Sequence, residues 1–152
     1  MPLAFQDHYP ERFSHCFGCG RNNPHGHHLK SYWDGDGTVA RFTIPPQYSG
    51  GVPGNAFGGM VASLVDCHGT ASAAAFASRA QGRDLGDGPE PMRFVTASLT
   101  IDFLRPTPIG EEVVVSGKLI GMDGRKVRVA LALSAHGEVC ARGEMLAIQF
   151  RN

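Results

Sequence analysis

The chain has 152 residues, of which 42% are hydrophobic and 18% are charged, a balance typical of a folded domain and not of a disordered chain. Lys and Arg together number 14, as do Asp and Glu, so no overall charge attracts nucleic acid and an anionic ligand needs a local cluster of cations. We therefore expect a single domain over residues 1–152 that binds a small molecule and no nucleic acid.

The first residues, "MPLAFQDHYPERF", lack the basic segment followed by an apolar run that marks an export signal. No stretch reaches the roughly 18 apolar residues that a membrane span needs. These features predict a cytoplasmic protein without a membrane partner. In that compartment the four cysteines are expected to be free thiols.

Residues 1–29 are rich in Gly, Asn, Pro and His, and we expect them to form an irregular arm that lies on the domain. Cys16 and Cys19 lie close to several histidines in this arm, and thiolates with imidazoles can close a tetrahedral zinc site. A structural zinc site usually shows two cleanly spaced pairs of ligands, whereas His27 and His28 are adjacent. The sequence therefore predicts no metal site.

The first regular element is expected at residues 38–44, "TVARFTI", where polar and apolar residues alternate as in a half-buried strand. The loop "PPQYSGGVPGNAFGG" follows, and its prolines and glycines exclude regular structure until Gly58 or Gly59. Apolar residues then recur at helical spacing from Met60 to about Ala80, which predicts one long helix. The segment "QGRDLGDGPEP", residues 81–91, ends that helix and is expected to be a loop.

Four alternating runs follow, at residues 93–104, 111–122, 125–136 and 138–150, and each predicts a strand. Asp123 and Gly124 form a pair that favours a tight hairpin turn, and Gly137 supplies the next turn. The last strands should therefore form an antiparallel meander. The expected fold class is α+β, with an antiparallel sheet wrapped around one long helix.

Gly58 and Gly59 at the start of the helix can present backbone N–H groups to an oxyanion, or they can simply form a tight entry into the helix. Asp66 follows Gly59 by seven residues, so both project from the same side of the helix, about 10 Å apart along its axis. A carboxylate in this small and apolar stretch is either hydrogen-bonded for stability or functional. His68 points about 200° away from Asp66 and cannot pair with it.

In the run "GRKVRV", Lys126 and Arg128 share one face of a strand and Arg125 lies at the hairpin. These cations either keep an exposed edge soluble or bind the phosphates of a nucleotide-like group.

The segments "FGGMVASLVD", "VTASLTIDFLRPTPIGEEV" and "GRKVRV", with "CFGCGRNNPHGHHLKSY" before them, together resemble the hotdog-fold acyl-CoA thioesterases of the phenylacetate-degradation type. The resemblance implies a hotdog fold and hydrolysis of an acyl-CoA, with Asp66 as general base or nucleophile. It implies that the backbone of Gly58 and Gly59 forms the oxyanion hole and that Thr96 of a neighbouring subunit positions water. It further implies a homodimer that can pair into a tetramer.

Under this resemblance no cofactor is needed, since coenzyme A is part of the substrate. The family often has His where this chain has Phe57, and Asn55 is only a nearby substitute for an Asn of the family's loop. Phe57 would add an apolar wall for an acyl chain. Candidates for binding the phosphates of coenzyme A are Arg105, Arg125, Lys126 and Arg128.

Two other functions stay open. A hotdog dehydratase would need a His beside Asp66, and a non-catalytic acyl-CoA binding protein is favoured by the loss of the His at Phe57.

Overall fold

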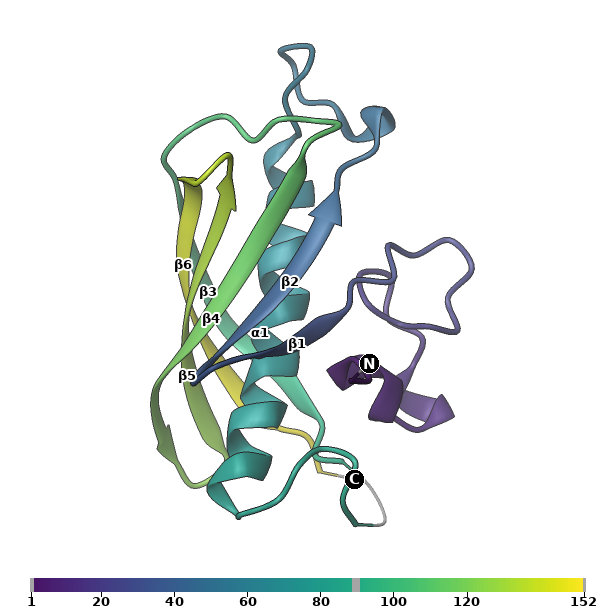
Figure 1. Ribbon diagram of the computed structural model, residues 1–152, viewed down its shortest axis with the longest axis vertical. Coiled ribbons are helices and arrows are strands. Elements are labelled where there is room, and N and C mark those ends of the chain that lie inside the picture. Colours follow the sequence, from purple (N-terminus) through teal and green to yellow (C-terminus); the bar gives the residue numbers. More distant parts are fainter. Residues whose placement is uncertain (1, 89–90, 152) are drawn as a thin grey trace.

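The computed structural model describes residues 2–88 and 91–151, where the chain forms one α-helix, α1 (Gly58–Ala80), and one six-stranded sheet. The strands are β1 (Ser31–Asp34), β2 (Gly37–Thr43), β3 (Phe94–Phe103), β4 (Glu112–Asp123), β5 (Lys126–Ala135) and β6 (Glu138–Gln149). All neighbouring strands are antiparallel, in the order β1-β2-β4-β5-β6-β3. Figure 1 shows the sheet curving along α1, so the predicted α+β architecture is confirmed.

The helix α1 starts at Gly58 and ends at Ala80, as the sequence predicts, and most of its surface is buried. Its alanines and Gly69 let the sheet approach closely: a Cβ at Gly69 would lie 2.5 Å from the terminal methyl of Met145 on β6. None of the described helices is both long and apolar enough to cross a membrane. Over its first half, one stripe of α1 stays partly accessible, and it consists of Gly59, Ala62, Ser63 and Asp66.

The predicted meander is confirmed for β4, β5 and β6, with left-handed backbone at Gly124 (φ 59°) in the first turn and at His136 and Gly137 (φ 54° and 77°) in the second. In contrast, β3 crosses the molecule to pair with β6 and forms one edge of the sheet. The other edge strand, β1, was not predicted. Gly35, with left-handed backbone (φ 62°), and Asp36 form the two-residue turn between β1 and β2.

A bulge in β3 between Thr96 and Ser98 changes the face to which the strand directs its side chains. Thr96 pairs with the buried Ala147, in a row of side chains that faces α1. Ser98 pairs with Leu146, whose other neighbour is the exposed Arg128, so Ser98 faces outward. With regular pairing, residues 96 and 98 would share one face. The bulge therefore turns the Thr96 hydroxyl toward the helix.

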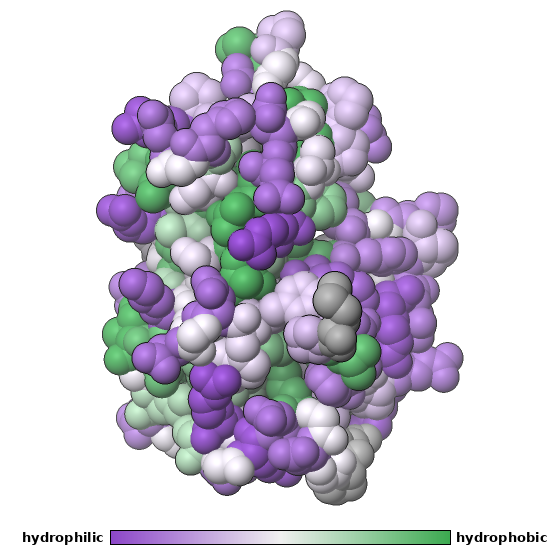
Figure 2. Space-filling view, viewed as in Figure 1, coloured by the Kyte–Doolittle hydropathy of each residue, from purple (hydrophilic) through white to green (hydrophobic). Residues whose placement is uncertain are grey.

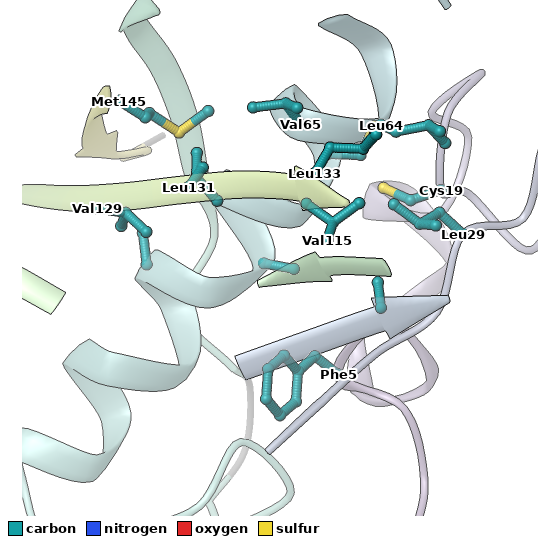
Figure 3. Packing of buried hydrophobic residues seen from close by; sticks show 14 of the residues in the cluster. Phe5, Cys19, Leu29, Leu64, Val65, Val115, Val129, Leu131, Leu133 and Met145 are labelled. Carbon is teal, nitrogen blue, oxygen red and sulfur yellow. The ribbon is translucent and has the colours of Figure 1, made fainter. Parts of the chain in front are cut away.

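The first 29 residues include the short 3-10 helices η1 (Phe5–His8) and η2 (Glu11–Phe13), and a third, η3 (Pro46–Tyr48), lies in the loop before α1. Figure 1 places this N-terminal arm beside β1. Its contacts are substantial: Phe5 meets Trp33 edge to face at 5.4 Å between ring centroids, and Cys19 and Leu29 belong to the hydrophobic core shown in Figure 3. Of the predicted loop at 81–91, residues 81–88 contain turns, and residues 89–90 lie outside the described residues.

Candidate active site

The N-terminus of α1 presents two backbone donors, the N–H groups of Gly58 and Gly59. The hydrogen bonds of the helix begin after them, where the N–H groups of Met60 and Val61 both donate to the carbonyl of Phe57, at 3.1 and 3.4 Å. Gly58 and Gly59 precede them, and their N–H groups have no acceptor within the helix. The helix dipole adds partial positive charge at this end, so an oxyanion placed here meets two donors.

Gly59 also has a packing role. A Cβ at this position would lie 2.5 Å from the ring of Phe57, which stacks on Tyr48 at 6.4 Å between centroids. The absence of a side chain at Gly59 thus lets the Phe57 ring lie against the helix start. Both sequence-based interpretations of the glycine pair, close packing and an accessible backbone, are therefore compatible with this geometry.

A cavity of about 410 Å³ opens beside Gly58. It is lined by Ala56, Gly58, Val61, Phe103, Leu104, Arg105, Pro106 and Thr107. Phe103 and Leu104 are exposed by 56% and 53% and are adjacent, so together they give the cavity an apolar surface. Neither residue is among the site residues expected from the sequence, although two consecutive apolar residues at the end of an alternating run are a visible signal. Phe57, expected to be the apolar wall, is not among the lining residues.

Asn55 lies in the loop that leads to this cavity. Its carbonyl accepts a hydrogen bond from the Gly50 N–H at 2.8 Å, and it forms an isolated β-bridge with Pro108. The backbone of Asn55 thus holds the loop against the segment that follows β3. Among residues 2–88 and 91–151, the Asn55 side chain forms no hydrogen bond.

Asp66 is half-buried, and one of its carboxylate oxygens accepts a hydrogen bond from the Thr96 hydroxyl. The two polar neighbours on its own helix are engaged elsewhere: Ser63 donates to the carbonyl of Met60 at 2.7 Å, and Thr70 to that of Cys67 at 3.2 Å. The carboxylate is therefore held by β3 and not by local capping. It lies on the accessible stripe of α1, where a substrate can reach it.

This contact corrects one sequence-based expectation. The Thr96 hydroxyl that meets Asp66 belongs to the same chain and not to a neighbouring subunit. The bulge in β3 is the physical reason, since it turns Thr96 toward α1.

The oxyanion donors and the carboxylate, on the other hand, are far apart within one chain. Asp66 lies seven positions after Gly59 on the same α-helix, about 10 Å along the axis. A reacting carbonyl needs its oxygen at the donors and its carbon about 3–3.5 Å from the attacking atom. One chain alone does not bring the two groups to a single carbonyl.

His68 lies on the opposite side of α1 and is completely buried. Its Nδ1 is 2.8 Å from the Ser31 hydroxyl, and its Nε2 is 3.0 Å from the Thr38 hydroxyl. Burial lowers the pKa of His68 to about 4. This network indicates a structural role for His68, and it does not fit a dehydratase pair of His68 with Asp66.

The candidate phosphate-binding cations fall into two groups. Arg105 follows β3 and pairs with Glu138 at 3.2 Å, whereas Arg125 donates to the carbonyl of Gln149 at 2.8 Å. The Arg105 N–H donates to the carbonyl of Cys140, which lies nine residues before Gln149 on β6. Since a strand rises about 3.3 Å per residue, the two arginines are about 30 Å apart along the sheet.

Lys126 and Arg128 lie with Arg125 near the β4–β5 turn, on the outer face of the sheet. Arg128 is 3.8 Å from Glu144 and borders an outer groove of about 540 Å³. Within one chain, the four cations therefore cannot hold a single phosphate group.

One antiparallel sheet wrapped around a single long helix defines the chain as a hotdog-fold protein. The family model of the thioesterase superfamily matches residues 53–136, more than half of the chain. The chain belongs to this superfamily, which confirms the resemblance seen in its sequence.

Solved structures agree. A thioesterase superfamily protein from Shewanella loihica is 41% identical, with a TM-score of 0.69 over 92% of this chain and 97% of that chain. The PaaI protein of the Escherichia coli phenylacetic acid degradation operon is 20% identical, with a TM-score of 0.59 over 77% of this chain and 79% of that chain, a level that shows a shared fold.

One curated relative is similar in sequence. The acyl-coenzyme A thioesterase THEM4 of Xenopus laevis is 27% identical over 104 residues, or 68% of this chain. The aligned part is 40% of that protein, so the chain spans less than half the length of this relative.

Proposed function

We propose that the protein hydrolyses an acyl-CoA thioester to the free acid and coenzyme A. The observation that carries this proposal is the Asp66 carboxylate, held by Thr96 on the accessible stripe of a helix whose first N–H groups have no acceptor within the helix. Membership of the thioesterase superfamily and the likeness to an acyl-coenzyme A thioesterase support it.

In the proposed reaction the thioester carbonyl oxygen binds at the N–H groups of Gly58 and Gly59. Asp66 takes a proton from a water molecule, which attacks the carbonyl carbon and gives a tetrahedral oxyanion. When this intermediate collapses, the carbon–sulfur bond breaks and coenzyme A leaves as a thiolate, which needs no strong general acid. Direct attack by Asp66, with a mixed anhydride that water then opens, uses the same groups.

The complete site requires two copies of the chain, because the glycine donors and Asp66 of one chain are too far apart for one carbonyl. The edge strand β3 is exposed along most of its length, and its free backbone groups can pair with a second copy. In such a dimer, Gly58 and Gly59 of one copy meet Asp66 of the other. The proposed dimer is thus a catalytic requirement.

The cavity beside Gly58 suggests where the acyl-CoA lies. Phe103 and Leu104 offer apolar surface for the acyl chain, and Arg105 at the same cavity is the cation best placed for a phosphate of coenzyme A. The cluster of Arg125, Lys126 and Arg128 serves a second phosphate only if the partner copy brings it near.

The test is release of free thiol from a panel of short, medium, long and aromatic acyl-CoAs. Asp66→Asn should lower kcat by roughly 10²–10⁴-fold, the usual contribution of a general base, with a Tm equal to or above that of the wild type. Asp36→Asn, in the exposed β1–β2 turn, is the matched control and should keep full activity. Wild-type protein that binds these thioesters without releasing thiol would instead support a non-catalytic binding protein.

A further inference from the structure

Three thiols from separate parts of the chain meet where the arm lies on α1. Cys16 and Cys19 belong to the arm and Cys67 to the helix, and their sulfur atoms all lie within 4.8 Å of one another. The Cys16 and Cys67 sulfurs are 3.7 Å apart although 51 residues separate them in the chain. Figure 3 shows Cys19 beside Leu29 at this boundary. The fourth cysteine, Cys140, lies outside the cluster and contacts the carbonyl of Glu138.

The loop that carries the first two thiols is shaped around the sulfur atoms. A Cβ at Gly18 would lie 2.2 Å from the Cys67 sulfur, so only glycine lets the loop close over that thiol. The Gly20 N–H donates to the Cys16 carbonyl at 2.8 Å, which closes the turn.

We propose that Cys16, Cys19 and Cys67 bind one zinc ion, which ties the arm to α1. Thiolates are preferred ligands of Zn²⁺, with Zn–S bonds of about 2.3 Å, and two such bonds at the tetrahedral angle place their sulfurs about 3.8 Å apart. The distance of 3.7 Å between Cys16 and Cys67 matches this spacing. Binding converts three thiols to thiolates and releases their protons to the solvent.

Three protein ligands leave one position of the tetrahedron for water or an added thiol. Cys16 is the half-exposed member of the cluster, so this position lies on the solvent side. The expectation of no metal site rested on the arm alone, where Cys16 and Cys19 lack a third ligand at a recognisable spacing. Only the folded structure brings Cys67 to them. This site is independent of the proposed thioesterase activity.

The first experiment titrates reduced, metal-free protein with Co²⁺ and then displaces it with Zn²⁺. Wild type should bind one ion per chain, with the thiolate charge-transfer and intense visible bands of tetrahedral cobalt, and Zn²⁺ should raise its Tm. Loss of a group that only orients a metal ligand weakens binding by roughly 10–100-fold, so Cys16→Ser, which removes a ligand, should weaken it by at least that factor. Because Cys16 is half-exposed, this variant should still fold.

Cys140→Ser removes a buried cysteine outside the cluster and is the matched control. It should bind Co²⁺ with the wild-type affinity and spectrum. The proposal is overturned if the reduced wild type binds neither ion, or if Cys16→Ser binds as tightly as Cys140→Ser. A protein that isolates with a disulfide within the cluster and binds no ion after reduction would likewise overturn it, in favour of a redox pair. Elemental analysis of the purified wild type gives an independent measure of zinc content.

Discussion

At the scale of single residues, the contact between Asp66 and Thr96 explains how a carboxylate is kept on a helix of small and apolar residues. An uncompensated buried carboxylate would be costly, but Asp66 is only half-buried and accepts a hydrogen bond from a hydroxyl on the neighbouring strand. That bond also restricts the rotamers of the carboxylate. A general base held in one orientation is more effective than a mobile one.

Two substitutions at Thr96 separate its hydroxyl from its shape. Thr96→Val keeps the volume but removes the donor, and we expect kcat to fall by about tenfold to a hundredfold because the carboxylate loses its orientation. Thr96→Ser retains the hydroxyl and should keep most of the activity. The comparison is made by steady-state thiol release. Equal rates for the valine and serine variants would exclude an orienting role for the hydroxyl.

His68 makes the stability of the fold depend on pH. Its pKa is lowered from 6.5 to about 4 by burial, so below pH 6.5 the unfolded chain binds a proton that the folded protein does not. The free energy of unfolding should therefore be highest above pH 6.5 and should fall by roughly 3 kcal/mol as the pH drops to about 4.

Urea unfolding at several pH values measures this dependence. His68→Gln can still hydrogen-bond to Ser31 and Thr38 but cannot titrate, so its curve should be flatter over the same range. Burial lowers the pKa of His27 as well, and the difference between wild type and variant isolates the part due to His68. Parallel curves for the two proteins would contradict the assignment.

At the scale of elements, the start of α1 combines two needs. The Phe57 ring packs against Gly59, which is possible only without a side chain at that position. The first N–H groups of the helix also have to be accessible to bind an oxyanion, and glycine leaves them uncovered. Exposed apolar residues lie at the same end, where Phe103 ends the edge strand β3 and Leu104 follows it. Figure 2 shows hydrophobic residues lying among hydrophilic ones on one face of the molecule.

Proline at position 58 tests the oxyanion donors without disturbing the helix. Gly58 is the first helical residue, a position that proline favours, and Phe57 before it already has the extended backbone that a following proline requires (φ −70°, ψ 152°). Gly58→Pro removes one N–H and should lower kcat by about 10²–10³-fold.

The matched control is Gly58→Ala, which retains the N–H. Its Cβ would make only an ordinary contact, 3.6 Å from the Phe103 ring. The alanine variant should keep most of the wild-type rate, and circular dichroism should report unchanged helix content for both. If alanine and proline lower kcat equally, the N–H of Gly58 is not an oxyanion donor.

At the scale of the whole molecule, the distance between the glycine donors and Asp66 means that each active site of the proposed enzyme is formed by two chains. An isologous dimer presents the same surface twice, so it would contain two equivalent sites, each with Asp66 from one copy and Gly58 from the other.

Subunit mixing tests this arrangement. Asp66→Asn and Gly58→Pro are each expected to be nearly inactive, yet a heterodimer of the two contains one intact site and one with both defects. Random assembly of the coexpressed variants should restore about a quarter of the wild-type activity per chain. If each site lay within one chain, every site in the mixture would carry a defect and activity would stay at the level of the single variants.

Much of the fold could be predicted from local pattern. The apolar spacing from Met60 to Ala80, the alternating runs and the Asp123-Gly124 turn correspond to α1, β4, β5 and their hairpin, because helix and strand periods and turn chemistry are properties of neighbouring residues. Gly58, Gly59 and Asp66 could be singled out for the same reason, since one helix carries all three.

The remaining features depend on contacts between distant segments. The sequence by itself determined the helix, the runs of strand and the side of the helix on which Asp66 lies, because periodicity and turn preferences act over a few residues. Only the tertiary structure decided that β3 pairs with β6, that its bulge turns Thr96 to Asp66, and that Cys67 joins Cys16 and Cys19. Strand order, register and side-chain clusters follow from which packing buries the most apolar surface for the whole chain, and no short stretch of residues contains that information.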